Sequence, residues 1–283
     1  MKKVLVTGCS GYIGSHLCKM LEKDYDVYGL DIKDPQTKLK HFNRQDINRP
    51  ISSYVTLDAV ASEIVFDAVI HLAALVKVGD TEKNPIQCYI TNINGTMNVV
   101  NKIKTKNFIF ASTGLAELCN STYGISKRAA EDVVREFCTA HNPTPYTIFR
   151  FYNVIGTSGF KPTNPDGLMH KLMQSAETGE FTIFGNDYET PDGTCVRDYV
   201  HVDEICQSLK MAIETPANKI ECLGHGKGRT VLEMFYLFKA VNKLDIMHKF
   251  GPRRKGDTPY SVLKDVSPYM QNLYSIEDLL KLP

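Results

Sequence analysis

Tyr123 and Lys127 are the two residues of this chain whose types and spacing are best suited to chemistry. They stand four residues apart in a segment that reads as a helix to about residue 140, so both side chains share one helical face. Thr113 ends a buried-strand pattern just upstream. A nearby ammonium favours a phenolate, so we expect Lys127 to lower the pKa of Tyr123 toward neutrality, where a general base works best. The three side chains together predict a proton-transfer site.

Short apolar strands alternate with helical patterns around these residues. Strands are expected at 3–7, 26–31, 65–72, 107–113 and 146–152, and helices at 12–23, 93–104 and 123–140. Such alternation predicts an α/β fold with a Rossmann-type doubly wound parallel sheet. Gly, Pro, Asn and Asp concentrate at 156–167 and 185–193. We therefore expect a Rossmann domain over 1–153 and a smaller, loop-rich substrate-binding lobe over 154–283, with helices at 204–215 and 231–242 packing back on the main sheet.

Three glycines connect the first strand to the first helix. Gly8, Gly11 and Gly14 form a Gly-x-x-Gly-x-x-Gly turn, which permits a tight turn and close backbone approach to a pyrophosphate. The N-terminus of the helix supplies N–H groups and a partial positive charge for the phosphates. The pattern predicts a dinucleotide site.

An acidic residue ends the second predicted strand and bears on the choice of cofactor. Asp31 lies 23 residues after Gly8, where a carboxylate can accept hydrogen bonds from ribose hydroxyls and repel a 2′-phosphate. This favours NAD over NADP; the alternative is that Asp31 only caps a turn. Asp46 and Ile47 stand where the next strand would end and could contact adenine, although a surface turn is the competing interpretation.

Composition excludes several classes of function. The 283 residues carry a net charge of +1, which gives no reason to expect nucleic acid or a membrane surface as partner. No apolar run is long enough to span a bilayer, and the first strand begins at residue 3, where a secretory signal would need a longer apolar run. The eight cysteines lack a Cys-x-x-Cys pair and read as buried thiols in a reducing compartment, so we expect a cytoplasmic protein. No metal-ligand spacing is present.

With these residues in order, the chain resembles the extended short-chain dehydrogenase/reductase family. More specifically, it is similar to the UDP-glucose (UDP-galactose) 4-epimerases in the runs FTIFGNDY at 181–188 and VRDYVHV at 196–202, with support from NINGT at 92–96, RFYN at 150–153 and PRRKGD at 252–257. The resemblance covers about 3–261. It implies NAD-dependent epimerisation at C4 of a UDP-hexose: NAD accepts the C4 hydride, the 4-keto sugar rotates, and the hydride returns to the other face.

The resemblance also implies roles for individual residues. Tyr123 would take the proton of the sugar 4-hydroxyl, Lys127 would hold the nicotinamide ribose, and Thr113 would hydrogen-bond the same hydroxyl. Further cofactor contacts are implied at Tyr12, Ile13, Leu72, Ala73, Ala74, Asn92 and Tyr152.

A second set of residues is implied to bind the UDP-sugar substrate. Arginine side chains can donate paired hydrogen bonds to pyrophosphate oxygens, although surface ion pairs are the alternative interpretation. An aromatic ring can flank a base, although core packing is the alternative there. By resemblance, Asn153 contacts the sugar nucleotide, Thr182 and Phe184 lie along the uracil, Arg197 and Arg254 bind the diphosphate, Asp257 meets the uridine ribose, and Leu168 lines the site.

The chain departs from the family pattern in three places. Tyr123 follows Thr113 by only ten positions, the region between Asp31 and Asp46 is short, and Asp166-Gly167-Leu168 stands where an asparagine is usual. The related 4,6-dehydratases carry an acid directly after the hydroxyl residue, a place taken here by glycine. Epimerisation is therefore preferred. A dehydratase remains an alternative because Glu117 could supply the missing acid. A non-catalytic protein that binds a sugar nucleotide or NAD is the alternative from another functional class.

Two further expectations concern the sugar and the assembly. Ser261 is aligned with the position that narrows the substrate pocket in the family, and a small residue there predicts that N-acetylated UDP-hexoses are accepted; Tyr260 in that place would exclude them. By resemblance we expect a homodimer, formed as a four-helix bundle by the helices near 93–104 and 123–140.

Overall fold

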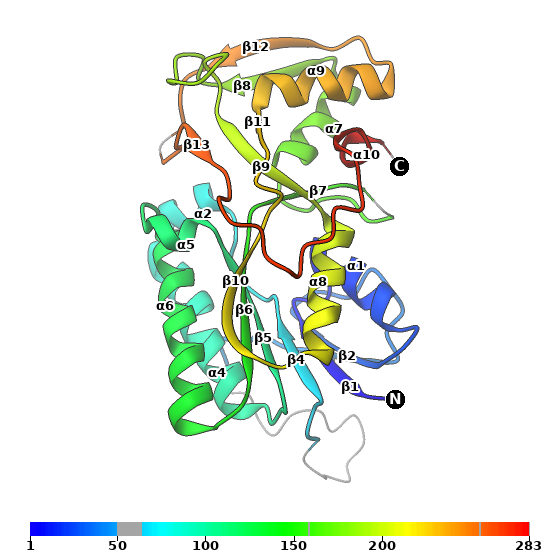
Figure 1. The fold of residues 1–283 in the computed structure, drawn as a ribbon, viewed down its shortest axis with the longest axis vertical. Helices are drawn as coiled ribbons and strands as arrows, with labels where there is room; N and C mark the ends of the chain where they lie inside the picture. Colours follow the sequence, from blue (N-terminus) through cyan, green and yellow to red (C-terminus); the bar gives the residue numbers. More distant parts are fainter. Residues whose placement is uncertain (50–63, 158, 255, 283) are drawn as a thin grey trace. The chain divides into compact units, whose positions relative to one another are not determined.

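A computed structural model describes residues 1–49, 64–157, 159–254 and 256–282. The chain divides into two compact units, shown in Figure 1. The first comprises Met1–Arg150 and Cys206–Glu221, and the second Phe151–Ile205 and Cys222–Pro283. The sequence predicted a boundary after residue 153, with helices at 204–215 and 231–242 packing back on the main sheet. In the structure the chain leaves the first unit after Arg150 and returns to it over 206–221. The expectation for 231–242 was wrong, because the apolar side chains of this helix pack in the core of the second unit.

The first unit is built on a seven-stranded sheet in the order β10-β6-β5-β4-β1-β2-β3. The pairs β1–β2, β1–β4, β2–β3 and β4–β5 are parallel, which confirms the predicted fold class. Strand order reverses between β1 and β4, and ligands of such sheets bind outside the strand ends at that point. The strands are β1 (Lys3–Thr7), β2 (Asp26–Asp31), β3 (His41–Arg44), β4 (Ala68–His71), β5 (Phe108–Thr113), β6 (Tyr146–Phe151) and β10 (Asn218–Leu223).

Helices cover both faces of this sheet, as α/β crossovers require. Figure 1 shows α4 and α6 on one side and α1 and α8 on the other. The buried residues Val99 and Val134 pack with Val69 and Phe110 of the strands in one core. The helices are α1 (Tyr12–Leu21), α2 (Val78–Lys83), α3 (Pro85–Tyr89), the π-helical η1 (Ile90–Asn94), α4 (Gly95–Lys102), α5 (Leu115–Leu118), α6 (Thr122–Glu136), the π-helical η2 (Phe137–His141) and α8 (Val202–Glu214).

The second unit is organised around β9 (Val196–His201). This strand pairs with β11 (Gly228–Thr230) in antiparallel and with β7 (Asn153–Ile155) and β13 (Tyr260–Ser261) in parallel fashion. A separate parallel pair is formed by β8 (Glu180–Phe184) and β12 (Met247–Gly251).

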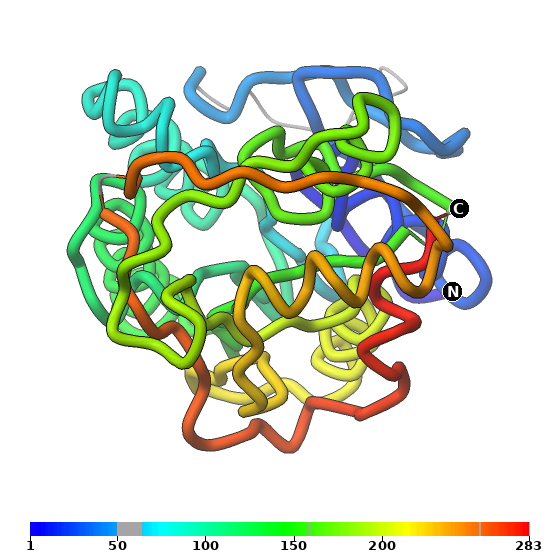
Figure 2. The backbone as a smooth tube through the Cα atoms, turned by 90° about the horizontal axis from the view of Figure 1, so that it is seen from above, coloured from blue at the N-terminus to red at the C-terminus, as the bar shows by residue number. Residues whose placement is uncertain are grey.

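Three helices complete the core of the second unit: α7 (Leu168–Thr178), α9 (Val231–Asn242) and α10 (Ile276–Leu280). The rings of Phe181 and Phe235 stack at 5.2 Å within that core. Figure 2 shows α9, in orange, beside the red C-terminal segment, with which it shares the core. The C-terminal segment therefore contributes to the folding of this unit.

Two buried carboxylates fasten the C-terminal segment inside the second unit. Asp198 accepts backbone N–H groups of His225, Gly226 and Leu263 at 2.9, 2.8 and 3.3 Å. Glu204 accepts a hydrogen bond from His225 Nε2–H at 2.8 Å and another from the backbone N–H of Leu273, also at 2.8 Å. Burial raises the pKa of Asp198, against the three N–H donors that favour its charge. Asp198 of the VRDYVHV run thus has a structural role.

Several sequence expectations about surfaces and thiols can be compared with the structure. Within the described ranges no helix is both long and apolar enough to cross a membrane, and no group of three or more metal-ligating side chains is assembled. All eight cysteines are free thiols, and Cys119 is the exposed one among them.

Candidate active site

The glycine turn shows which of its glycines the fold itself requires. Gly8 has a φ of +74°, and a Cβ there would lie 2.7 Å from the backbone nitrogen of Ala73, while a Cβ on Gly14 would lie 2.1 Å from the Gly8 carbonyl oxygen. A Cβ on Gly11 would meet only that carbonyl oxygen, at 3.2 Å. Gly11 is also the N-cap of α1 and makes no side-chain cap. The space over Gly11 and the helix N-terminus fits the pyrophosphate of a dinucleotide.

Asp31 lies beside this turn at the end of β2. One carboxylate oxygen accepts the Ser10 N–H at 3.0 Å, and the other accepts the Lys33 N–H at 3.1 Å. Each oxygen of an ionised carboxylate can accept a second hydrogen bond. Asp31 therefore keeps acceptors for the two hydroxyls of a ribose, which fits NAD.

The two residues predicted near adenine differ in their surroundings. Asp46 lines an open hollow together with Arg44, Gln45 and Arg49. Ile47, in contrast, is 5% exposed and packs in the core, where it lies over Gly95 so closely that a Cβ there would be 2.7 Å from Ile47 Cδ1. The Ile47 side chain thus serves packing.

A buried chain of hydrogen bonds joins the ends of β1 and β4. Thr7 Oγ1 lies 2.6 Å from His71 Nδ1, His71 Nε2 lies 3.0 Å from Thr96 Oγ1, and Thr96 donates to the Asn92 carbonyl at 2.7 Å. Thr96 must therefore accept from Nε2–H, which makes Nδ1 the acceptor for Thr7. Burial lowers the pKa of His71 to about 3, so a neutral ring with a defined tautomer supports the loop at Ala73, whose N–H donates to Thr7 Oγ1 at 3.3 Å.

Asn92 ties this loop to the helix that carries Tyr123. Its Oδ1 accepts the Leu75 N–H at 2.8 Å, and its Nδ2 donates to the Leu75 carbonyl at 3.0 Å and to Ser126 Oγ at 2.9 Å. Ser126 in turn donates to the Tyr123 carbonyl at 2.7 Å. The side chain of Asn92 is fully buried. It therefore supports the loop at Leu75 through hydrogen bonds and does not itself project toward a ligand.

Tyr123 and Lys127 lie on α6, and Thr113 ends β5, which packs against α6. Lys127 is 3% exposed, and its Nζ lies 4.0 Å from the centroid of the Phe110 ring. Tyr123 is half-buried. The Thr113 hydroxyl accepts the Leu115 N–H at 3.3 Å, which leaves its proton available to donate.

The expected effect of Lys127 on Tyr123 is wrong for this arrangement. Burial disfavours the charged form of both groups. It lowers the pKa of Lys127 to about 7, with partial compensation from the Glu131 carboxylate, and raises the pKa of Tyr123, with a smaller push from the Cys88 thiol. Desolvation is thus the largest effect on the pKa of each group.

The short route from Thr113 to Tyr123 forms an ordered turn of helix, α5, which the sequence did not predict. Ser121 caps α6 by accepting the Gly124 N–H at 3.1 Å. A Cβ on Gly124 would lie 2.6 Å from the Leu115 carbonyl oxygen, so α5 packs directly on the start of α6. The short loop before Tyr123 is therefore tightly packed against α6.

An ion-pair network holds α5 and α6 on the sheet. Arg150 donates to both Glu131 oxygens, at 2.9 and 2.7 Å, and to Glu117 at 2.8 Å, while Ser112 donates to Glu131 at 2.5 Å. The Arg150 and Glu131 side chains are 9% and 1% exposed. The bidentate guanidinium pair satisfies the buried charge. Glu117, which kept a dehydratase open, is engaged by Arg150.

In the second unit, two predicted substrate arginines share one predicted substrate carboxylate. Asp257 pairs with Arg254 Nε at 2.9 Å and with Arg197 Nη2 at 3.4 Å. The guanidinium carbon of Arg254 lies 5.1 Å from the centroid of the Phe184 ring. Lys171, which sequence reasoning missed, lies 4.8 Å from the same centroid. No motif marks Lys171, because its closeness to Phe184 is a tertiary contact.

The other predicted residues of this unit have identifiable local contacts. The Asn153 amide donates to the Asp198 carbonyl at 3.1 Å, and the Tyr152 N–H donates to the Leu223 carbonyl at 3.1 Å. Leu168 begins α7 and packs on the core, and Thr182 lies in β8 opposite Lys249. Asn153 and Leu168 therefore have structural contacts beside any role in binding.

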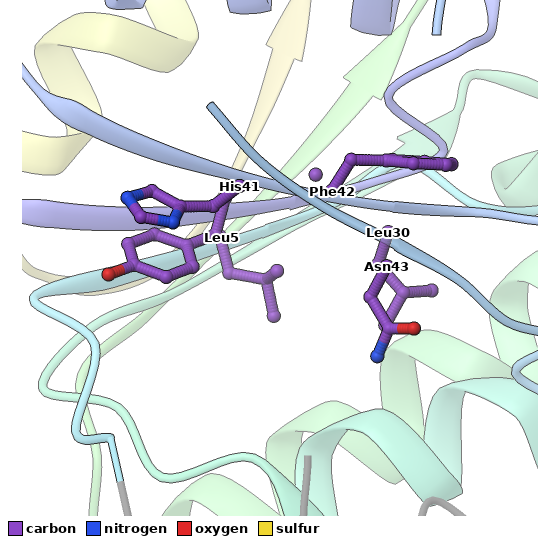
Figure 3. A pocket seen from close by; sticks show the side chains of 7 residues that line it. Leu5, Leu30, His41, Phe42 and Asn43 are labelled. Carbon is purple, nitrogen blue, oxygen red and sulfur yellow. The ribbon is translucent and has the colours of Figure 1, made fainter. Parts of the chain in front are cut away.

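A small pocket lies away from these residues, at the β1–β2–β3 edge of the first unit (Figure 3). The rings of Tyr28 and His41 stack there at 4.2 Å. None of the predicted site residues lines it, and it offers no carboxylate or lysine. Its lining consists of Leu5, Tyr28, Gly29, Leu30, His41, Phe42 and Asn43.

Comparison with known proteins places this geometry in a family. Residues 4–222 match the model of the NAD dependent epimerase/dehydratase family. UDP-glucose 4-epimerase of Bacillus subtilis is 31% identical over 90% of this chain and 86% of its own length. Among solved structures, UDP-glucose 4-epimerase of Thermotoga maritima with UDP-glucose is 29% identical, with a TM-score of 0.83 over 98% of this chain and 96% of that one. The enzyme of Bifidobacterium longum in complex with NAD+ and UDP is 26% identical, with a TM-score of 0.86 over 99% and 96%. The matched span includes the glycine turn, Asp31, Thr113, Tyr123 and Lys127, and on this evidence the chain belongs to the NAD dependent epimerase/dehydratase family.

Proposed function

We propose that this protein is an isomerase that interconverts the C4 epimers of a UDP-hexose with NAD as its cofactor. The observation that carries the proposal is the first unit's arrangement of Tyr123 and Lys127 on one helix beside the strand that ends in Thr113. A protein that only bound the nucleotides would have no need of a phenol placed beside a lysine and a hydroxyl. The relatives named as UDP-glucose 4-epimerases support the choice of substrate.

The residues of the first unit divide the work of the reaction. NAD, when bound, supplies a reversible hydride acceptor for the sugar carbon. Gly11 and the start of α1 would hold its pyrophosphate, Asp31 its adenosine ribose, and Lys127 its nicotinamide ribose. Tyr123, as the phenolate, would take the proton of the sugar 4-hydroxyl and, as the phenol, return it to the 4-keto oxygen, while Thr113 would donate to that oxygen and orient it.

The buried lysine explains how Tyr123 could serve as the base although burial raises its pKa. Ribose hydroxyls on Lys127 would provide hydrogen bonds that favour the ammonium. A charged Lys127 would then oppose the effect of burial on the Tyr123 pKa. The acid–base pair is thus expected to be assembled fully by cofactor binding.

We further propose that N-acetylated UDP-hexoses are accepted beside the plain sugars. Ser261, a small residue, lies opposite Arg197 in the β13–β9 register, while Tyr260 is 54% exposed. A small side chain beside a diphosphate-binding arginine leaves room for a larger sugar substituent. Turnover of UDP-glucose without any turnover of UDP-N-acetylglucosamine would contradict this second proposal and leave the first intact.

The test of the main proposal is NMR of the purified protein with NAD and, in turn, UDP-galactose, UDP-glucose and their N-acetyl forms. We expect the C4 epimer to accumulate to equilibrium. Tyr123→Phe should bind NAD normally and lose about 10²- to 10⁴-fold in turnover, the usual share of a general acid–base group. Tyr236→Phe, at an exposed tyrosine of the second unit, is the matched control. A stable keto product, or full activity of Tyr123→Phe, would refute the mechanism.

We also propose a homodimer. Exposed apolar side chains recur on the consecutive helices α3, η1 and α4 of the first unit, with Ile86 at 71%, Ile90 at 36% and Met97 at 39% exposed. Ile125 on α6 is 43% exposed, and α3 and η1 contact α6. Apolar side chains gathered on contacting helices favour a protein interface.

Light scattering coupled to size exclusion tests this assembly. We expect a dimer for the wild-type chain and a monomer for the double variant Ile86→Glu, Ile90→Glu. Val266→Glu, at a residue of the second unit that is 50% exposed, should remain dimeric. A monomeric wild type would end the proposal.

A further inference from the structure

We propose that Lys171 is a third cationic contact for the diphosphate of the nucleotide sugar, beside Arg197 and Arg254. This inference rests on the proposed function, because it concerns the same ligand. It begins with the Phe184 ring, which has two cations against it: Lys171 Nζ lies 4.8 Å from the ring centroid, and the Arg254 guanidinium carbon lies 5.1 Å from it. One aromatic side chain is thus contacted both by a lysine of α7 and by an arginine of a loop distant in the sequence.

The charges of this cluster are not balanced by the protein. Arg197 and Arg254 share a single carboxylate, Asp257, at 3.4 and 2.9 Å. Lys171 forms no ion pair with any described carboxylate within 4.0 Å. Three cations against one carboxylate leave two positive charges, which matches a diphosphate diester with one negative charge on each phosphate. Clusters of one sign raise the local concentration of ligands of the other sign.

The position of Lys171 on its helix points the same way. It stands in the first turns of α7, whose N-cap is Gly167 and whose first turn contains no acidic residue. The N-terminal end of a helix carries a partial positive charge, so a cation there is unfavourable for the helix while an anion is favourable. Helix stability therefore gives no reason for a lysine at this position, whereas an anionic ligand does.

A second lysine of the same unit shows what a purely structural contact looks like. Lys239 Nζ lies 5.7 Å from the centroid of the Phe235 ring, and it has its own carboxylate partner, Asp245, at 3.8 Å. Lys239 thus combines an aromatic contact with local charge compensation. Lys171 has the aromatic contact without the compensation, and this difference provides the matched control.

Calorimetric titration of the NAD-loaded full chain with UDP and with uridine tests the inference. We expect Lys171→Met to weaken UDP binding about 10- to 100-fold, the effect of a charge-assisted hydrogen bond, and to change uridine binding less than about twofold. Lys171→Arg should recover most of the affinity for UDP, because it restores the charge. Lys239→Met should bind both ligands as the wild type does.

Each contrary outcome has a defined meaning. Wild-type affinity of Lys171→Met for UDP, in an enzyme that loses affinity on Arg254→Met, would overturn the inference and leave the proposed function intact. Equal weakening of UDP and uridine would also overturn it, since Lys171 would then support the base or the fold. A wild type that binds UDP but epimerises no UDP-hexose would contradict the proposed function while the Lys171 result stands. Circular dichroism of each variant checks that the fold is kept.

Discussion

The region around Tyr123 in the first unit and the cationic cluster of the second unit differ in how far their polar and charged side chains are paired within the protein. Around Tyr123 the polar side chains are buried and find partners in the protein: Asn92 bonds the loop at Leu75 and α6, and Arg150 forms a bidentate pair with Glu131. In the second unit, the exposed Arg254 shares one carboxylate with Arg197. The first region is organised by its own residues, whereas we propose that the second is completed by an anion. The residues around Tyr123 are held by hydrogen bonds within the protein, and the positive charge of the second cluster is only partly paired.

Lys127 is the exception within the first region, and its replacement should have the largest effect. Lys127→Met is expected to reduce turnover by about 10²-fold or more, since an activating charge is lost. It should also stabilise the protein. The pKa of Lys127 falls from 10.5 to about 7 on folding, so the buried ammonium costs stability in full below pH 7, and this cost declines as the pH rises from 7 toward 10.5.

Denaturant unfolding of both proteins at pH 6 and pH 9 measures the effect. The gain in the free energy of unfolding on Lys127→Met should be larger at pH 6 than at pH 9. A gain that is equal at the two pH values would mean that Lys127 keeps its charge at both. The surrounding residues would then stabilise that charge as they do the other polar groups of this region.

The next largest effect should come from the buried ion pair. Arg150→Met leaves Glu131 buried without its partner, which typically costs about 3–5 kcal/mol. Arg253→Met removes an ion pair with Asp187 whose side chains are 48% and 68% exposed, and pairs of this kind contribute about 0–1 kcal/mol. Urea unfolding of the two variants compares them directly. Similar losses would show that the network at Arg150 is no better organised than a surface pair.

Gly11→Ala separates the space for a ligand from the space that the fold needs. Because a Cβ there meets only the Gly8 carbonyl oxygen at 3.2 Å, we expect a loss of less than about 1 kcal/mol in stability and a loss of about tenfold or more in NAD affinity. Gly14→Ala, whose Cβ would lie 2.1 Å from that oxygen, should lower the melting temperature markedly. Unchanged NAD binding by Gly11→Ala would place the pyrophosphate elsewhere.

The smallest effect concerns the cluster of like charges in the second unit. Lys171→Met should leave the melting temperature unchanged or raise it slightly without UDP, within the ±0.5 kcal/mol typical of substitutions at the surface, because one repulsive charge is removed. Thermal unfolding with and without UDP measures this. A clear destabilisation without UDP would mean that Lys171 supports the fold, as the first region's polar groups do.

Many elements of both units could be predicted from the chain because their signals are local. The segments 26–31 and 231–242 were predicted with the bounds found for β2 and α9, since alternation of apolar runs and turn residues reports burial directly. The helix of Tyr123 was expected to extend to about residue 140, and it does so as α6 followed by η2. The glycine turn and Asp31 needed only the order of strand, turn and helix.

The sequence by itself determined the fold class, the cofactor turn and the pair Tyr123 and Lys127, because period, spacing and turn chemistry act over a few residues. Only the tertiary structure decided that Glu117 serves Arg150, that Lys171 meets Phe184, and that burial raises the pKa of Tyr123. These properties depend on desolvation and on contacts between residues far apart in the chain. Such contacts arise only when the elements pack, and no local pattern records them.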